Sequence, residues 1–326
     1  MRWSLLVAVF GLSTLDVASF AQGRPAGDRL STSRSGPDDS GFFASAGVVR
    51  FQLVQGRLCL DCPRHRKGSQ SCDENGVFES ITVTAERGIP SLHYVCQSDR
   101  HQLTLSVQEA KAMRIESWFP QSGERAVLNQ PAVGQLTWHH TREDHTDQYQ
   151  GTNLLHLRHA NPDAFDHHFG GLIQRLLRGE SLRTISESTQ QIMLEELPLD
   201  SPINQDEVRQ CVEQLRASRR ATRIDAERQL LAWGTLIVPS LRNMLEGDLD
   251  TEQRERLRHI IKRLRPMIPD TPATLAKLLV NDHAYWSRIA GGLTDEQLRL
   301  ANRHLTQFNA QPIELTSQPV YRIARP

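Results

Sequence analysis

Short alternations of apolar and polar residues dominate the chain from residue 46 to about residue 150. Residues 49–53 and 103–107 each carry an apolar side chain at every second position, which places those side chains on one face of an extended strand. Further runs of this kind lie at residues 58–60, 81–85, 92–96, 113–118 and 133–138. Short strands separated by turn residues predict an antiparallel β-sandwich or a small barrel over residues 46–150. A single open, curled sheet is the alternative.

A different period governs residues 201–310. The apolar residues between 208 and 215 recur at intervals of three and four, and those between 257 and 264 do the same. This spacing is typical of amphipathic helices. Asp250 is placed to cap the second of these helices, and Pro266 follows its end. The sequence therefore predicts an α+β protein in which a β-rich domain precedes a helical domain.

The stretch AERQLLAWGTLIVPSLRNMLEGDLDTEQRERLRHIIKRL, from Ala226 to Leu264, has a recognisable pattern of helices and turns. Gly234 ends one predicted helix and Pro239 begins the next. Together with the helix before it, this order resembles a HEAT-like repeat over residues 206–265. The resemblance implies a stacked antiparallel helix pair and usually a binding or scaffold role. It carries no catalytic residue over to this chain.

A single repeat cannot bury its apolar face alone, so we expect other helices to close the ends of this short solenoid. One candidate is a helical connector over residues 151–200, in which Asn161 caps the second helix and Pro162 occupies its first turn. The other is a degenerate helical unit after residue 271. The tail, residues 311–326, is expected to form an edge strand or to dock on the helices. The whole layout resembles large families of exported bacterial proteins that have no assigned activity.

The N-terminus has the pattern of an export signal. Arg2 precedes an apolar run over residues 3–15, and small residues favour cleavage after Ala21. The predicted signal peptide therefore spans residues 1–21, and a leader with few apolar residues, expected to be disordered, follows over residues 22–45. The apolar run is shorter than the ~20 residues that cross a bilayer. We expect an exported protein, periplasmic or extracellular, without a transmembrane span in the mature chain.

Charge gives little direction to the choice of partner. The 326 residues include 38 acidic and 38 basic residues, and a net charge of zero provides no global attraction to nucleic acid or to anionic membranes. Four arginines form a possible basic binding patch: Arg216, Arg219, Arg220 and Arg223. A solvated helix face is the first interpretation of this patch. If it binds a ligand, an anionic envelope polymer or an acidic protein suits an exported chain better than nucleic acid.

Four cysteines lie in the β-rich part: Cys59, Cys62, Cys72 and Cys96. The spacing of the first three is similar to half of a zinc site. Exported thiols tend to pair in an oxidising compartment, so at least one disulfide is the first expectation, with its connectivity left open. Buried, unpaired thiols and a metal site are the alternatives. Cys211 lies on an apolar helix face and is predicted to be a buried thiol.

Histidine is concentrated in the middle of the chain, where seven of the 13 residues lie between residues 139 and 168. They are His145 and six candidate metal ligands, His139, His140, His156, His159, His167 and His168. Imidazoles among carboxylates can bind zinc, copper or non-haem iron. The spacing matches no HExxH motif, however, and histidines between apolar stripes are expected to face water. The sequence therefore predicts neither a metal nor another cofactor.

No catalytic arrangement stands out, and a GxSxG motif is absent. The sequence predicts an exported, non-catalytic interaction or scaffold protein, whose helical repeat presents a binding surface to a protein or to an anionic envelope polymer. The alternatives are an exported hydrolase that uses His139 or His140, and a metal-binding protein that uses residues 139–168. A metal-binding protein would bring several of the central histidines within ligand distance of one another.

Overall fold

A computed structural model of the chain describes most of the residues beyond the N-terminal region. The described residues are 49–62, 67–143, 145–195, 203–266, 268–307 and 309–313, together with the backbone of residues 321–324. All of them belong to one compact unit, which runs from Asp38 to Pro326. The predicted signal peptide and leader lie outside the described residues. Of the helices described, none combines the length and the apolar character needed to cross a membrane.

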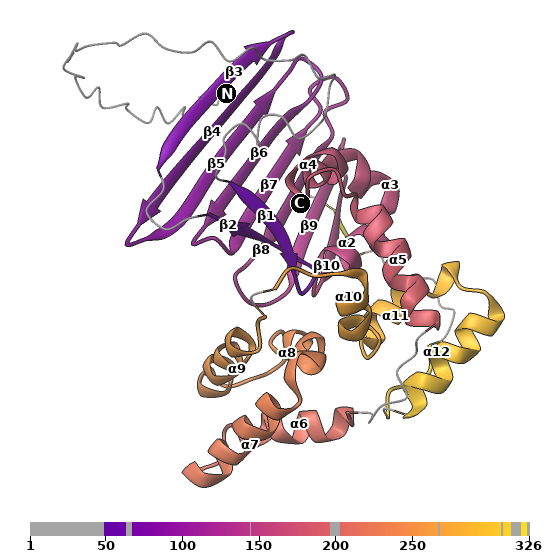
Figure 1. Cartoon of the computed structure of the whole chain (residues 1–326). Coiled ribbons are helices and arrows are strands. Elements are labelled where there is room, and N and C mark those ends of the chain that lie inside the picture. Colours follow the sequence, from indigo (N-terminus) through magenta and orange to yellow (C-terminus); the bar gives the residue numbers. More distant parts are fainter. Residues whose placement is uncertain are drawn as a thin grey trace, which may run out of the picture. The chain divides into compact units, whose positions relative to one another are not determined.

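One antiparallel sheet forms the β-rich part. Its strands follow one another in chain order (Figure 1): β3 (Gly68–Glu74), β4 (Val77–Glu86), β5 (Ile89–Gln97), β6 (Gln102–Gln108), β7 (Ala112–Trp118), β8 (Arg125–Gln130), β9 (Leu136–Arg142) and β10 (His145–Gly151). The C-terminal strand β11 (Tyr321–Ala324) pairs with β10, as one of the two expectations for the tail had it. The sheet, followed in the chain by helices, confirms the predicted α+β class.

The predicted sandwich or barrel is wrong, because β3 and β11 are the two edges of a sheet that does not close. The alternative of a single open sheet is correct. The central strands have one apolar face, as on β6, where Leu103, Leu105 and Val107 are buried. Polar side chains occupy the opposite face of the central strands, such as Arg114 and Glu116 on β7. An antiparallel sheet of this kind needs a cover on one side only.

Helices and a β-hairpin provide that cover. The hairpin consists of β1 (Arg50–Val54) and β2 (Arg57–Asp61), and Leu58 exchanges hydrogen bonds of 3.1 and 2.7 Å with the Gln130 side chain on β8. After β10 the chain forms α2 (Leu154–Ala160), α3 (Pro162–Phe165), a π-helical turn η1 (Asp166–Gly170), α4 (Gly171–Leu176) and α5 (Leu182–Glu195). α2 contacts β9 and β10 (Figure 1). The turn η1 contacts β7.

The predicted cap of the connector is confirmed. The Asn161 side chain accepts a hydrogen bond from the backbone N–H of Ala164, and Pro162 lies in the first turn of α3. A helix that begins here directs Phe165 and Phe169 into the core, where both are fully buried against Trp138 of β9. The local sequence thus determines where the segment that carries His167 and His168 meets the sheet.

The remaining helices follow residue 203. They are α6 (Gln205–Gln214), α7 (Arg220–Ala232), η2 (Gly234–Ile237), α8 (Val238–Met244), α9 (Thr251–Arg263), α10 (Pro272–Leu279), α11 (His283–Ile289), η3 (Ala290–Gly292) and α12 (Asp295–Gln307). Pro239 lies in the first turn of α8, and Asp250 forms a capping box with Gln253 at the start of α9. α6 packs on α7 and α9, and α8 packs on α9.

Candidate metal centre

His140 is a buried imidazole in the sheet. Side chains alternate along β9, so His140 shares the core face with Leu136 and Trp138, whereas His139 faces the other way. The His140 residue is 2% exposed, and neither of its ring nitrogens has a hydrogen-bond partner among the residues that the structure describes. Buried polar atoms in proteins are nearly always satisfied, so an imidazole in this state requires an explanation.

His168 approaches the same place from the π-helical turn. Its Nδ1 lies 2.9 Å from Ser117 Oγ on β7, and Ser117 Oγ lies 2.8 Å from His101 Nε2. The His168 residue is 1% exposed, and its Nε2 has no hydrogen-bond partner within the described part of the chain. One ring nitrogen is therefore anchored and the other is left available. π-helical turns of this kind are frequent at functional sites.

Glu124 supplies a carboxylate beside the two imidazoles. It lies in the turn between β7 and β8, and its side chain is 26% exposed. One ligand atom each from Glu124, His140 and His168 can be chosen so that all three lie within 4.8 Å of one another. The contacts of this carboxylate with neighbouring side-chain nitrogens are long, since Arg142 Nε is 3.9 Å and His167 Nε2 4.0 Å from it.

Burial keeps these imidazoles neutral. It is the main cause that lowers the pKa of His168 to about 3, and the neighbouring His140 and His167 lower that pKa further. Burial also lowers the pKa of His140 and of His101 below the ordinary value. Metal ions bind the unprotonated ring, so at neutral pH no proton has to be displaced.

The three groups fit a transition-metal ion. Zinc binds imidazole nitrogen and carboxylate oxygen at about 2.0–2.2 Å, which puts tetrahedral ligand atoms roughly 3.4 Å apart. The ligand atoms, which lie within 4.8 Å of one another, would have to approach by up to about 1.4 Å to reach that geometry, a movement within the reach of side-chain torsions. Metal-bound histidines usually donate their second ring N–H to an oxygen, as His168 Nδ1 is placed to do toward Ser117.

The other central histidines have local roles. His156 is buried with its Nε2 3.1 Å from Asp282 Oδ2, and His159 Nε2 contacts Ser186 Oγ at 2.7 Å. His145 Nε2 contacts Asp147 Oδ1 at 2.9 Å. The expectation that the histidines of the connector helices face water is wrong for His156 and His168, because the connector packs on the sheet and buries them.

Sequence reasoning missed two contributors, Glu124 and the anchoring pair His101 and Ser117. Each lies outside residues 139–168, and the antiparallel register brings them in. Ser117 pairs with Leu103 across β6 and β7, and Ala126, two residues beyond Glu124, pairs with His140 across β8 and β9. The only usable signal was the alternation of β9, which assigns His140 and not His139 to the core face.

The cysteines do not approach this centre, and no disulfide joins any of the cysteine positions that the structure describes. Cys72 and Cys96 both lie opposite Glu79, on the two strands that flank β4. Two strand spacings separate their backbones by about 9.5 Å, which is too far for a disulfide. Cys59 is buried beside Arg265, and burial raises the pKa of its thiol. Cys211 is half-buried on α6.

Half of the possible basic patch is engaged within the chain. Arg216 pairs with Glu213, and Arg223 donates to the carbonyl oxygen of Ala217 at 2.7 Å. Arg219 and Arg220 are exposed at the start of α7.

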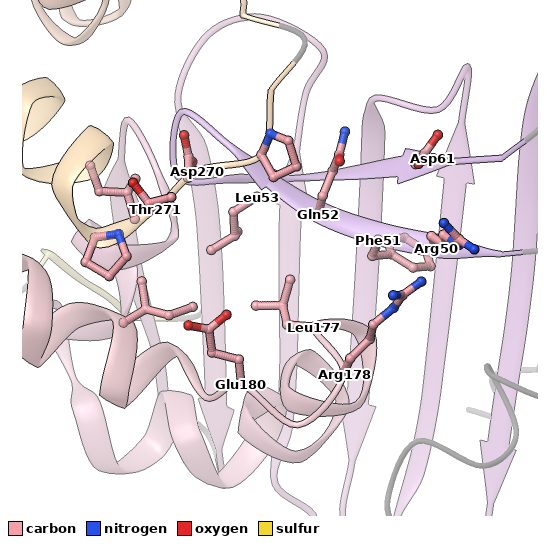
Figure 2. Close-up of a pocket in the computed structure, with 14 residues that line it drawn as sticks. Arg50, Phe51, Gln52, Leu53, Asp61, Leu177, Arg178, Glu180, Asp270 and Thr271 are labelled. Carbon is pink, nitrogen blue, oxygen red and sulfur yellow. The ribbon is translucent and has the colours of Figure 1, made fainter.

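A cavity of about 280 Å³ lies between the hairpin and the connection from α4 to α5. Figure 2 shows Arg50 and Arg178 at one end and Asp270 and Thr271 at the other. Leu53 and Leu177 are among the apolar side chains between the two ends. Histidine is absent from its lining among the described residues, and the charged groups at its rim have both signs. The cavity therefore defines no single class of ligand.

No family model matches this chain, and the comparisons with curated proteins and with solved structures likewise gave no match.

Proposed function

We propose that this protein binds one divalent transition-metal ion, zinc in preference, through Glu124, His140 and His168. The observation that carries the proposal is the unsatisfied polarity of the two imidazoles, which are buried and face a carboxylate with ring nitrogens that lack a partner among the described residues. Each unsatisfied buried polar atom costs about 1–3 kcal/mol. A bound cation would satisfy one nitrogen on each ring and offset that cost.

The donor set supports zinc over the hard cations. Magnesium and calcium prefer oxygen ligands, whereas two imidazoles and one carboxylate suit zinc or ferrous iron. Iron(II) is the main competitor because the same three groups form its facial triad in oxygenases. Zn²⁺ has a filled d shell and no redox chemistry. We therefore propose zinc as the ion bound by an exported protein. The exported location is itself part of the proposal and depends on the predicted signal peptide.

The test is a metal titration of the exported chain after chelator treatment. We expect one zinc ion to bind per chain, measured by calorimetry and by elemental analysis after gel filtration. His140→Ala and His168→Ala should each abolish binding or weaken it at least a hundredfold. His139→Ala is the matched control, because this neighbouring residue faces the opposite side of β9. A wild-type chain that binds no zinc or iron, or variants that bind as well as wild type, would contradict the proposal.

The helical part supports a second proposal, a HEAT-like binding surface on α6 to α9. Its support is the contact of α6 with α7 and α9 and of α8 with α9, together with the exposed side chains Arg220 and Ile224, one turn apart on α7. An acidic protein or an anionic envelope polymer remains the expected partner. Replacing Arg219 and Arg220 by alanine should weaken co-sedimentation with an anionic cell-wall polymer, whereas Arg114→Ala on the outer face of the sheet should not.

A further inference from the structure

His167 lies next to the candidate metal centre but is not one of its three proposed ligands. Its side chain is 55% exposed, and its Nε2 lies 4.0 Å from Glu124 Oε2. The ring stacks on Phe119 with centroids 4.2 Å apart, while His168 meets the edge of the same Phe119 ring at 5.1 Å. Two consecutive imidazoles therefore contact one aromatic ring in the turn between β7 and β8.

The π-helical turn explains this arrangement. Consecutive side chains on an α-helix diverge by about 100°, and the wider π-turn, with its i to i+5 hydrogen bonds, reduces that divergence. Within η1, the rings of His167 and His168 both contact Phe119. His168 is the inner of the two and is anchored on Ser117, whereas His167 has no hydrogen bond to a described residue.

We propose that His167 is the fourth ligand and closes the coordination sphere of the ion held by Glu124, His140 and His168. This inference rests on the proposed function of the site. His140 and His168 form its buried half, and Glu124 and His167 form its solvent-facing half. A turn of the exposed His167 ring away from Phe119 and toward the carboxylate completes a tetrahedral set of three imidazoles and one carboxylate.

A closed sphere determines what the metal can do. Catalytic zinc sites keep one position for water or substrate, whereas structural sites fill all four with protein ligands. With His167 bound, no position remains for a hydrolytic water. The site would bind its ion to stabilise the fold or to transport the metal. This role differs from that of the exported hydrolase, whose zinc would need a bound water.

Cobalt(II) is the probe for the test, because four-coordinate and water-bearing higher-coordinate cobalt differ strongly in visible absorption. The wild-type chain should bind one Co²⁺ with the intense bands of a four-coordinate ion. His167→Ala should still bind one Co²⁺, at least about tenfold more weakly, with weakened bands because water replaces the imidazole. His139→Ala is the matched control and should leave both the affinity and the spectrum unchanged.

X-ray absorption on the zinc-loaded wild-type chain provides a measurement that does not depend on any variant. Three imidazoles per zinc are expected, and two imidazoles with a water ligand would overturn the role of His167. An unchanged spectrum and affinity in His167→Ala would overturn it as well. A wild-type chain that binds neither Co²⁺ nor Zn²⁺ would instead refute the proposed function, so the two failures are distinguishable.

Discussion

At the scale of single residues, burial identifies the two histidines that form the inner half of the centre. His140 and His168 are almost completely buried and lack partners for their inward ring nitrogens within the described chain, whereas His156 and His159 are equally central in the sequence but are bound to Asp282 and Ser186. A ligand must offer a neutral nitrogen that nothing else occupies. Among the six candidate histidines, these two are therefore the buried ligands of the proposed centre.

Ser117 is a positioning residue for His168. Ser117→Ala removes the oxygen that anchors His168 Nδ1 and the hydroxyl next to His101 Nε2. We expect zinc affinity to fall about 10–100-fold and the free energy of unfolding to fall by about 1–2 kcal/mol. Ser106→Ala is the control, since Ser106 meets His93 on the exposed face of the sheet. Equal affinities of Ser117→Ala and wild type would show that the anchor has no role in binding.

The lowered pKa of His168 makes the metal-free protein sensitive to acid. The folded state holds this pKa at about 3 because of burial, while the unfolded chain titrates near 6.5. The unfolded state then binds more protons between these values, so this contribution to stability is complete above pH ~6.5 and is lost as the pH falls toward 3.

Thermal unfolding of the metal-free chain at pH 7, 6, 5 and 4.5 measures this effect. The melting temperature should fall with pH more steeply for wild type than for His168→Phe, which has no titrating ring. Parallel curves for the two chains would argue against the buried, neutral state of His168.

At the scale of elements, turns and caps position the centre without touching it. The hairpin turn at Gln55 and Gly56 requires positive φ at both residues, and a Cβ added to Gly56 would lie 2.8 Å from Asn153 Cβ. Asn153 caps α2, the helix that leads to η1. The hairpin turn and the cap of α2 therefore share one tight contact, and α2 and α3 connect that cap to the segment that carries His168.

Gly56→Ala tests this contact. Backbone strain at φ +66° and the clash with Asn153 should together lower the free energy of unfolding by about 2–4 kcal/mol. Gly76→Ala is the matched control, because Gly76 has a similar φ of +75° but open space around it, so strain alone should cost about 1 kcal/mol. Urea unfolding measures the loss in free energy of unfolding for each variant. Equal losses in the two variants would mean that Asn153 moves aside at no cost.

At the scale of the whole molecule, buried polar contacts tie the helical part to the hairpin. Arg242 of α8 is buried, donates to Gln55 Oε1 at 2.7 Å, and has its pKa lowered to about 10 mainly by burial. Gln55 Nε2 in turn donates to the carbonyl oxygen of Leu264 after α9 at 3.1 Å. The hairpin, which covers the sheet, is thus bonded to both α8 and the end of α9.

Arg242→Ala should remove this link and leave Gln55 Oε1 unsatisfied. We expect the free energy of unfolding to fall by about 2–4 kcal/mol, with sheet and helices still unfolding together because they share one apolar core. Arg256→Ala is the control, since this arginine forms an ion pair with Glu252 one turn away on α9 and should cost less than about 1 kcal/mol. If hydrogen exchange in the wild-type chain showed the helices opening independently of the sheet, the shared core would be contradicted.

Local sequence patterns were sufficient to predict the helices and strands, but they were insufficient to predict how these elements are arranged in space. The caps at Asn161 and Asp250, and the prolines Pro162 and Pro266, could be assigned from sequence, because a cap depends on neighbours within four residues. The closure of the sheet could not be assigned, since alternation says which face is apolar but not what covers it. The same limit concealed Glu124, which lies 16 residues before His140 in the chain.

The sequence by itself determined that this protein has alternating strands followed by amphipathic helices, where its helices start, and which residue types could hold a metal. Only the tertiary structure decided that the sheet is open, that His140 and His168 are buried, and that Glu124 stands beside them. The reason is physical. Secondary structure follows from interactions over a few residues, whereas a ligand set depends on strand register and helix packing between segments that are distant along the chain.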